Sequence, residues 1–174
     1  MKKCKERILK IFFEEPFKEY YLREISRIAK IPVDNAHKYL HYFLKKGFLN
    51  VRKEKNRSFF RANLKNEFLL KIFEYFELER RQEFFRKNPS LLKLQDITND
   101  ILTLIWEPAI VLYNRKNSEV ILITSYSSES LSESKIMKIL NLSEFRAIKD
   151  QILHEDTIVL YNEFLYWREK IRSY

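Results

Sequence analysis

Cysteine and glycine are almost absent from this sequence, which has one of each, Cys4 and Gly47, in 174 residues. A single cysteine excludes an intrachain disulfide and a cysteine-based zinc site. A single glycine excludes the glycine-rich loops that cradle nucleotide phosphates. Long apolar runs are also lacking, both of the length that spans a membrane and of the type found in a secretion signal. We therefore expect a cytoplasmic protein with no membrane segment and no cofactor.

Positive charge is concentrated in the first part of the chain. Residues 1–65 contain 18 Lys or Arg and 7 Asp or Glu, a net charge of +11, whereas residues 66–174 contain 15 and 17, a net charge of −2. Such asymmetry is typical of a module that neutralises phosphate groups. A lysine-rich surface that is merely solvated is the alternative that charge alone leaves open.

Three helices and a hairpin are predicted within the basic part. Apolar residues recur at helical spacing in three segments, residues 3–13, about 20–30 and 33–46. Gly47 follows the third segment, where a left-handed residue ends a helix most easily. Residues 48–53 and 58–62 have the character of two strands around a polar turn. Three helices, with a tight turn between the last two, and a basic hairpin predict a winged helix-turn-helix.

The predicted third helix has two chemically different faces. Its apolar stripe consists of Val33, Ala36, Leu40, Phe43 and Leu44. Its opposite face carries Asp34, Asn35, Lys38, His41, Tyr42 and Lys45. Asparagine pairs well with adenine edges and lysine with guanine or phosphate, while His and Tyr reach phosphates and thymine methyls. Because early residues of this helix reach base edges in such a motif, Asn35 and Lys38 are the predicted readers of sequence.

Further basic residues on the second helix and the hairpin are predicted to bind DNA phosphates. They are Arg23, Arg27 and Lys30 on the helix, and Arg52, Lys53, Lys55 and Arg57 on the hairpin. A solvated polar surface remains the ordinary alternative for any one of them.

The chain contains a histidine pair and several acidic pairs that could suggest a metal site or a catalytic site. His37 and His41 lie four residues apart and could share a metal, but no Glu follows His37, no further Cys completes a shell, and His154 is distant in the sequence. Acidic pairs such as Asp96 with Asp100 resemble ordinary helix-surface charge. We expect no metal site and no enzymatic activity.

The remaining chain is predicted to alternate helices with short strands. A long helix covers residues 66–87, and Asn88 with Pro89 opens a second one that runs to about 105. Apolar runs predict strands at 109–113, 120–124 and 157–161. Ser130 with Glu133 predicts a capped helix through Leu140, Ser143 a cap for the next, and a final helix begins near Glu163.

The predicted fold class is α+β with three parts. Residues 1–65 form the DNA-binding domain, residues 66–105 a helical linker or dimerisation region, and residues 106–174 a small α/β domain.

Several short segments of residues 3–65 match the sequence pattern of a known family. They are Tyr21-Leu22-Arg23-Glu24-Ile25-Ser26-Arg27, Leu40, Phe43, Gly47-Phe48-Leu49, Arg57 and Ala62-Asn63. In these features residues 3–65 resemble the winged helix-turn-helix transcriptional regulators of archaea and bacteria. The resemblance implies DNA binding by the third helix and the wing, usually as a dimer.

The C-terminal part contains a second, more distant set of matches. The segments are Ala109-Ile110-Val111-Leu112-Tyr113-Asn114-Arg115, Ser118-Glu119-Val120-Ile121-Leu122 and Thr157-Ile158-Val159-Leu160-Tyr161-Asn162. They are similar to three strands of the minimal nucleotidyltransferase domains. The family's Gly-Ser pair is replaced by Asn114-Arg115, and its two metal-binding aspartates by Glu119 and Ile121. Because isoleucine cannot ligate Mg²⁺, the resemblance implies a degenerate, inactive scaffold.

The leading hypothesis is a dimeric DNA-binding transcriptional regulator whose C-terminal domain serves dimerisation or the sensing of an unknown small molecule. One alternative is a nucleotidyltransferase-type enzyme, or an antitoxin-like protein, that the winged helix targets to DNA. Another is a winged helix that binds protein or is purely structural, which the net charge of +11 disfavours.

Overall fold

The chain divides into two compact units, which we call unit 1 (Met1–Phe73) and unit 2 (Glu74–Tyr174). The computed structural model describes residues 3–104, 109–125, 137–149, 152 and 156–171. It contains both helices and two sheets, which confirms the α+β class. The predicted domain boundaries at 65 and 105 stay predictions, and the second lies outside the described residues.

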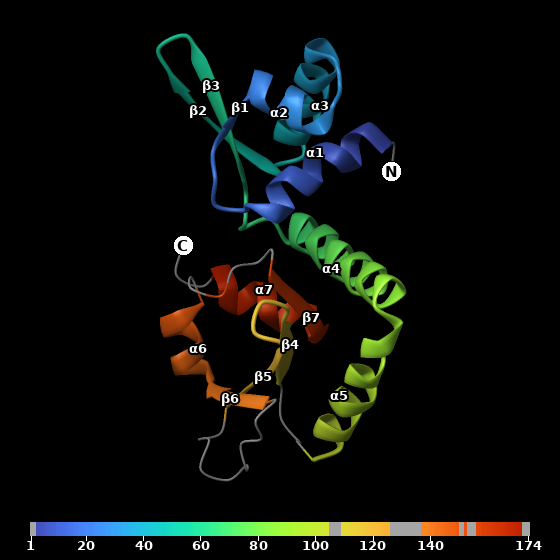
Figure 1. Cartoon of the computed structure of the whole chain (residues 1–174). Helices are drawn as coiled ribbons and strands as arrows, with labels where there is room; N and C mark the ends of the chain where they lie inside the picture. Colours follow the sequence, from blue (N-terminus) through green and yellow to red (C-terminus); the bar gives the residue numbers. More distant parts are fainter. Residues whose placement is uncertain (1–2, 105–108, 126–136, 150–151, 153–155, 172–174) are drawn as a thin grey trace. The chain divides into compact units, whose positions relative to one another are not determined.

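Unit 1 consists of three helices, a three-stranded sheet and residues 67–73 of a fourth helix, α4, which continues into unit 2 (Figure 1). Its elements are α1 (Lys3–Glu14), β1 (Tyr20–Tyr21), α2 (Leu22–Ala29), α3 (Val33–Lys45), β2 (Leu49–Glu54) and β3 (Arg57–Ala62). The strand order is β1-β3-β2 with antiparallel pairing throughout. The predicted third helix and hairpin are confirmed within one or two residues at each end.

The start of the second helix was predicted wrongly. Tyr20 and Tyr21 form the short strand β1, which pairs with Phe60 and Phe59 of β3, and α2 begins only at Leu22. Tyr20 is buried and its ring packs edge-on against that of Phe12, with 5.7 Å between the centroids. Packing against residues distant in the sequence therefore prevails over helical spacing here.

The core of unit 1 is formed by the inner faces of its helices. Ala36, Leu40 and Phe43 of the predicted α3 stripe are buried, whereas Leu44 is half-buried and Val33 is exposed, which corrects the expectation for these two. The buried stripe of α3 is therefore narrower than predicted, and Val33 and Leu44 at its edges contact solvent.

The turn between α2 and α3 is tight because its backbone bonds are closed locally. Lys30 adopts the left-handed conformation, with φ of 53°, at the end of α2. The Ile31 amide donates to the carbonyl of Ser26 over 3.1 Å, and the Ser26 hydroxyl donates to the carbonyl of Ile31 over 2.7 Å. These two bonds fix the angle at which α3 leaves α2.

The end of α3 is tied to the hairpin. Gly47 has φ of 69°, as its predicted place after the helix requires. Its carbonyl accepts a hydrogen bond of 2.8 Å from the side-chain amide of Asn63, just beyond β3. The backbone N–H of Asn63 in turn donates to the carbonyl of Phe48 over 2.9 Å. Both ends of the hairpin are thus held against the C-terminus of α3.

Unit 2 contains a four-stranded mixed sheet with the order β6-β5-β4-β7. Its elements are the latter part of α4 (Glu67–Lys87), a 3-10 turn η1 (Pro89–Leu91), α5 (Lys93–Leu104), β4 (Ile110–Asn114), β5 (Glu119–Thr124), β6 (Met137–Asn141), α6 (Leu142–Ile148), β7 (Thr157–Tyr161) and α7 (Glu163–Ile171). β4 is antiparallel to both of its neighbours, and β5 and β6 are parallel. The three predicted strands of this part are confirmed.

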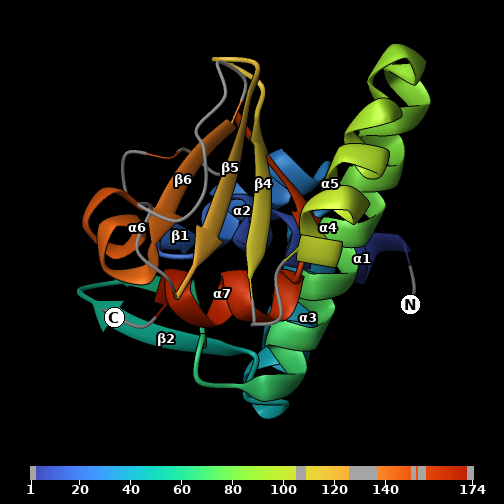
Figure 2. The ribbon, with the colours of Figure 1, turned by 90° about the horizontal axis from the view of Figure 1, so that it is seen from below.

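Helices cover both faces of this sheet. Phe84, Phe85, Leu94 and Ile101 of α4 and α5 pack against one face in a single buried cluster. α6 and α7 contact the strands from the other face, where Trp167 is fully buried (Figure 2). When both faces of a sheet are covered, consecutive residues of its strands are apolar, which explains the apolar runs from which these strands were predicted.

Three predictions in unit 2 are wrong, and one cannot be scored. Residues 137–140 form strand β6 rather than a helix, because they pair with β5. Asn141, not Ser143, caps α6 in a capping box with Glu144. Asn88 stands at the N-cap position of η1, with Pro89 first in the turn, but the predicted side-chain cap is absent, because the side-chain amide of Asn88 donates to the Phe84 carbonyl over 2.8 Å. The proposed cap at Ser130 and Glu133 lies outside the described residues.

Candidate nucleic-acid interface

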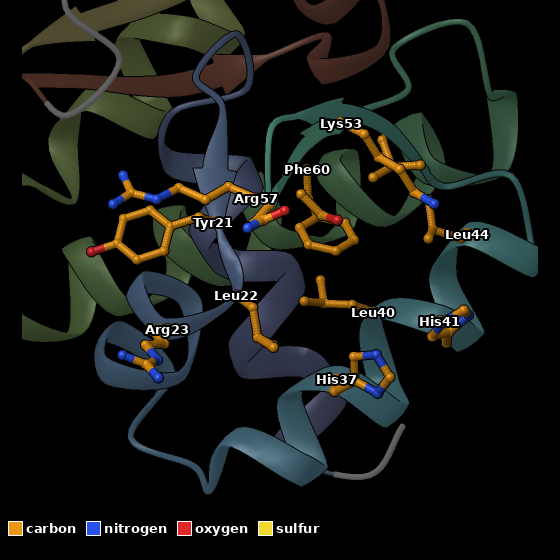
Figure 3. Close-up of a pocket in the computed structure, with 13 residues that line it drawn as sticks. Tyr21, Leu22, Arg23, His37, Leu40, His41, Leu44, Lys53, Arg57 and Phe60 are labelled. Atoms are coloured by element: carbon orange, nitrogen blue, oxygen red, sulfur yellow. The ribbon is translucent and has the colours of Figure 1, made fainter.

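A groove of about 940 Å³ lies between α3 and the hairpin of unit 1. Its floor is apolar, and Leu22, Leu40 and Phe60 point toward its middle (Figure 3). α2 and β1 close one end, where Tyr21 and Arg23 line it. The tight turn after α2 and the tie at Gly47 hold the walls of this groove in place.

The rim of the groove is cationic. Arg23, Lys53 and Arg57 surround it together with His37 and His41, as Figure 3 shows, and no Asp or Glu is among the residues that line it. Three fixed positive charges around a concave surface attract an anion more strongly than separate charges on a flat surface do.

The eleven predicted DNA contacts are all exposed. They are Arg23, Arg27, Asp34, Asn35, Lys38, His41, Tyr42, Lys45, Lys53, Lys55 and Arg57. Four of them line the groove: Arg23, His41, Lys53 and Arg57. The other seven lie outside it, on the outer surface of α2 and α3 and on the tip of the hairpin.

The seven cations among these contacts carry charge that the protein does not neutralise by pairing. Within the described chain, none of Arg23, Arg27, Lys38, Lys45, Lys53, Lys55 and Arg57 forms an ion pair. By contrast, Lys10 pairs with Glu6 at 3.1 Å and Lys18 with Glu15 at 2.9 Å on the surface of the same unit. The helices and the hairpin that were predicted to meet DNA therefore carry seven cations that form no ion pair.

Arg52, which was predicted to contact phosphate, pairs with two carboxylates in the structure, and its phosphate contact stays a prediction. Its guanidinium donates to Glu19 over 2.7 Å and to Glu54 over 2.6 Å, and it lies over the ring of Phe59. The hydrogen bond from Arg52 holds the pKa of the Glu19 carboxyl below its usual range. Arg52 thus links β2 to the segment that precedes β1, although about half of its side chain stays exposed, with 52% relative accessibility.

Sequence reasoning missed the apolar floor of the groove and four of its residues with polar side chains: Tyr21, His37, Asn56 and Ser58. His37 had a usable signal, because it precedes the predicted contact His41 by one helical turn, and their rings are 4.9 Å apart. Tyr21 had none, since its position depends on the pairing of β1 with β3. The part of the structure that is described contains no cluster of three or more metal-ligating side chains, and His154 lies outside it.

The two positions that matter for the nucleotidyltransferase resemblance lie on β5. Glu119 is half-buried at the start of the strand, opposite Asn114, and Ile121 is buried within the sheet. Two residues apart on one strand, they share a face of the sheet, where Ile121 contributes no ligand atom.

Comparisons with known proteins add little. The chain matches no protein-family model, and no curated protein matches it. Among solved structures it is similar to Sso10a-2, a DNA-binding protein from Sulfolobus solfataricus, with 24% sequence identity and a TM-score of 0.36, over 52% of this chain and 93% of that chain. This likeness is distant, and the function proposed below therefore rests on the residues of unit 1. In the described ranges no helix is long and apolar enough to span a membrane.

Proposed function

We propose that the chain binds double-stranded DNA through unit 1, which acts as a winged helix-turn-helix. The observation that carries this proposal is the set of seven exposed, unpaired cations on α2, α3 and the hairpin, three of which line a groove without carboxylates. Phosphate contacts of this kind supply most of the affinity of a protein for duplex DNA.

α3 enters the major groove in this proposal. An α-helix with its side chains is about 10–12 Å wide, which fits a groove about 12 Å across. Asn35 and Lys38 are exposed in the first two turns of α3, where they reach base edges, while Lys45 near its end meets the backbone. The Asp34 carboxylate in the first turn accepts from a cytosine amino group.

The hairpin and the groove bind the sugar-phosphate backbone that runs beside α3. Lys53 and Arg57 on the rim, and Lys55 at the hairpin tip, face phosphates. The apolar floor formed by Leu22, Leu40 and Phe60 accommodates deoxyribose, which has little polarity of its own. The Arg52 pairs with Glu19 and Glu54 keep the hairpin in one orientation before DNA arrives.

We further propose that the chain is a non-enzymatic transcriptional regulator that acts as a dimer. Two copies of α3 would then meet half-sites about one or more helical turns apart. Unit 2 serves dimerisation or the sensing of a small molecule in this proposal. The nearly neutral charge of residues 66–174 supports a role for unit 2 that does not involve phosphate contacts.

Duplex binding at several salt concentrations tests the proposal. Fluorescence anisotropy of a labelled 24-bp duplex, selected from random sequence by the chain itself, should show an affinity that falls steeply between about 50 and 200 mM salt. An affinity that ignores salt, or no binding near micromolar protein at low salt, would contradict it.

Substitutions then separate base reading from phosphate binding. Asn35→Ala and Lys38→Gln should alter the selected sequence, because each removes a contact with a base edge. Lys55→Gln should leave the selected sequence unchanged and lower the salt slope by about one. If Lys55→Gln changes sequence preference as strongly as Lys38→Gln, the assignment of α3 as the reader is wrong.

A further inference from the structure

Tyr42 is held by a residue of another helix. The Lys5 ammonium of α1 lies over the Tyr42 ring of α3, with its Nζ 3.3 Å from the ring centroid. The Tyr42 side chain is exposed and that of Lys5 is half-buried. Neither has an ion pair or a side-chain hydrogen bond elsewhere among the described residues. The contact between a cation and an aromatic face therefore sets the position of both groups.

This contact marks the flank of α3 that faces away from the groove. Successive residues of a helix are turned by about 100°, so Tyr42 lies about 100° around α3 from His41 and about 140° from His37. Both histidines line the groove on the hairpin side, whereas Tyr42 does not. The outer face of α3, with Lys38 and Lys45, therefore has the hairpin on one flank and the start of α1 on the other.

We propose that Lys5 binds a DNA phosphate on this second flank and that Tyr42 is the residue that positions it. The inference rests on the proposed function and extends the interface to α1, which sequence reasoning did not include. An ammonium has three N–H donors and strong affinity for phosphate, so contact with a ring on one side leaves donors for an anion on the other. Tyr42, predicted as a DNA contact itself, acts through Lys5.

A helix in the major groove meets phosphates on both sides, because a DNA strand borders the groove on each side. The hairpin supplies Lys53, Lys55 and Arg57 for one strand. Without α1 this flank of α3 would meet its strand with Tyr42 and with the exposed Lys46 at the end of the helix. Lys5 adds a second cation there, and a held ammonium loses less freedom on binding than a mobile one does.

The test uses the full chain and the selected 24-bp duplex. Lys5→Gln should weaken binding about fivefold at 100 mM salt and lower the salt slope by about 0.9, the change expected for one phosphate. Lys10→Gln is the matched control, since it removes the same charge from the other side of α1, where Lys10 pairs with Glu6. Its effect should be less than about twofold. Ethylation of single phosphates should reveal one position that hinders the wild type and no longer hinders Lys5→Gln.

A double-mutant cycle tests the positioning role of Tyr42. Tyr42→Ala should weaken binding about threefold, Tyr42→Phe should bind as the wild type does because it keeps the ring, and Lys5→Gln with Tyr42→Ala should be no weaker than Lys5→Gln alone. Independent, multiplicative losses would contradict the positioning role. Thermal unfolding of each variant checks that it is folded, and Lys5→Arg, which keeps charge and ring contact, should retain affinity.

Two outcomes separate this inference from the proposed function. If the wild type binds duplex DNA and Lys5→Gln binds equally well, Lys5 makes no phosphate contact and only the present inference is wrong. If the wild type binds no duplex, the proposed function is wrong and this inference is wrong with it.

Discussion

The two units of the chain differ in net charge and in how their charged side chains are exposed and paired. Residues 1–73 contain 19 Lys or Arg and 8 Asp or Glu, a net charge of +11, whereas residues 74–174 contain 14 and 16, a net charge of −2. Unit 1 leaves many of its cations exposed and without ion pairs on one set of neighbouring elements. Unit 2 also has exposed lysines, but several of its charged side chains are buried and bonded within the unit, among them those of Lys149, Glu169 and Lys170.

The C-terminal helices illustrate such bonding within unit 2. Lys149 is buried and its ammonium donates to the backbone carbonyl of Lys170 over 2.9 Å. The buried Lys170 ammonium donates to the hydroxyl of Tyr166 over 2.9 Å, and Arg146 pairs with Glu169 at 2.6 Å. The bonds of Lys149 and Arg146 join the C-terminal part of α6 to α7, and that of Lys170 lies within α7. The comparison teaches that the location and pairing of cations, rather than their number, separates a binding surface from a scaffold.

The largest expected effect tests whether unit 2 is a scaffold. Trp167→Ala should lower the free energy of unfolding by about 3–5 kcal/mol, because the fully buried indole leaves a cavity on one face of the sheet. Phe164→Ala, on the exposed side of the same helix, should cost less than about 1 kcal/mol. Urea unfolding followed by circular dichroism measures both. Equal losses would contradict the described packing of α7.

The next effect tests the charge comparison directly. Lys38→Gln, Lys53→Gln and Arg57→Gln together should weaken duplex binding about 100-fold at 100 mM salt, at roughly fivefold for each phosphate or base contact. The matched control removes three exposed lysines from unit 2, with Lys93→Gln, Lys116→Gln and Lys138→Gln. Its net charge is identical, yet its affinity should change less than about threefold. Similar losses in both triple variants would show that net charge alone drives binding.

A smaller effect depends on pH and concerns the stability of unit 1. Hydrogen bonds from Lys18 and from the Tyr20 hydroxyl lower the pKa of the Glu15 carboxyl. A carboxyl whose pKa is lower in the folded protein stabilises it above the unfolded value of about 4.3 and ceases to do so as pH falls through the folded value. Glu15→Gln should therefore cost about 0.5–1 kcal/mol at pH 7, a value reduced by solvent screening, and almost nothing at pH 3. A cost that is the same at both pH values would contradict the assignment.

The smallest effect concerns the tight turn before α3. Lys30 is left-handed without being glycine, so Lys30→Gly should raise the free energy of unfolding by about 0.5 kcal/mol. Lys46, at the end of α3, has φ of −83°, and Lys46→Gly should lower it by about 0.5–1 kcal/mol. Thermal unfolding compares the two. Changes of the same sign in the free energy of unfolding would contradict the assignment of backbone strain to Lys30.

Local patterns predicted the outer face of α3, the hairpin and the glycine between them, because helical spacing, strand character and turn chemistry all lie within a few neighbouring residues. Partners distant in the sequence decided the rest. β1 exists because Tyr20 pairs with Phe60, and β6 because residues 137–141 add to the edge of β5. Arg52 is taken up by Glu19, and Tyr42 is covered by Lys5. Such long-range contacts leave no periodic pattern in the sequence from which they could be predicted.

Hydrogen exchange with and without the selected duplex tests the central claim most directly, because it reports on both units in one measurement. The account predicts slower amide exchange on adding DNA in residues 33–62, which cover α3 and the hairpin, and at the start of α1, with no change in β4, β5 and β7. Protection confined to the strands of unit 2, or no protection in α3, would contradict it.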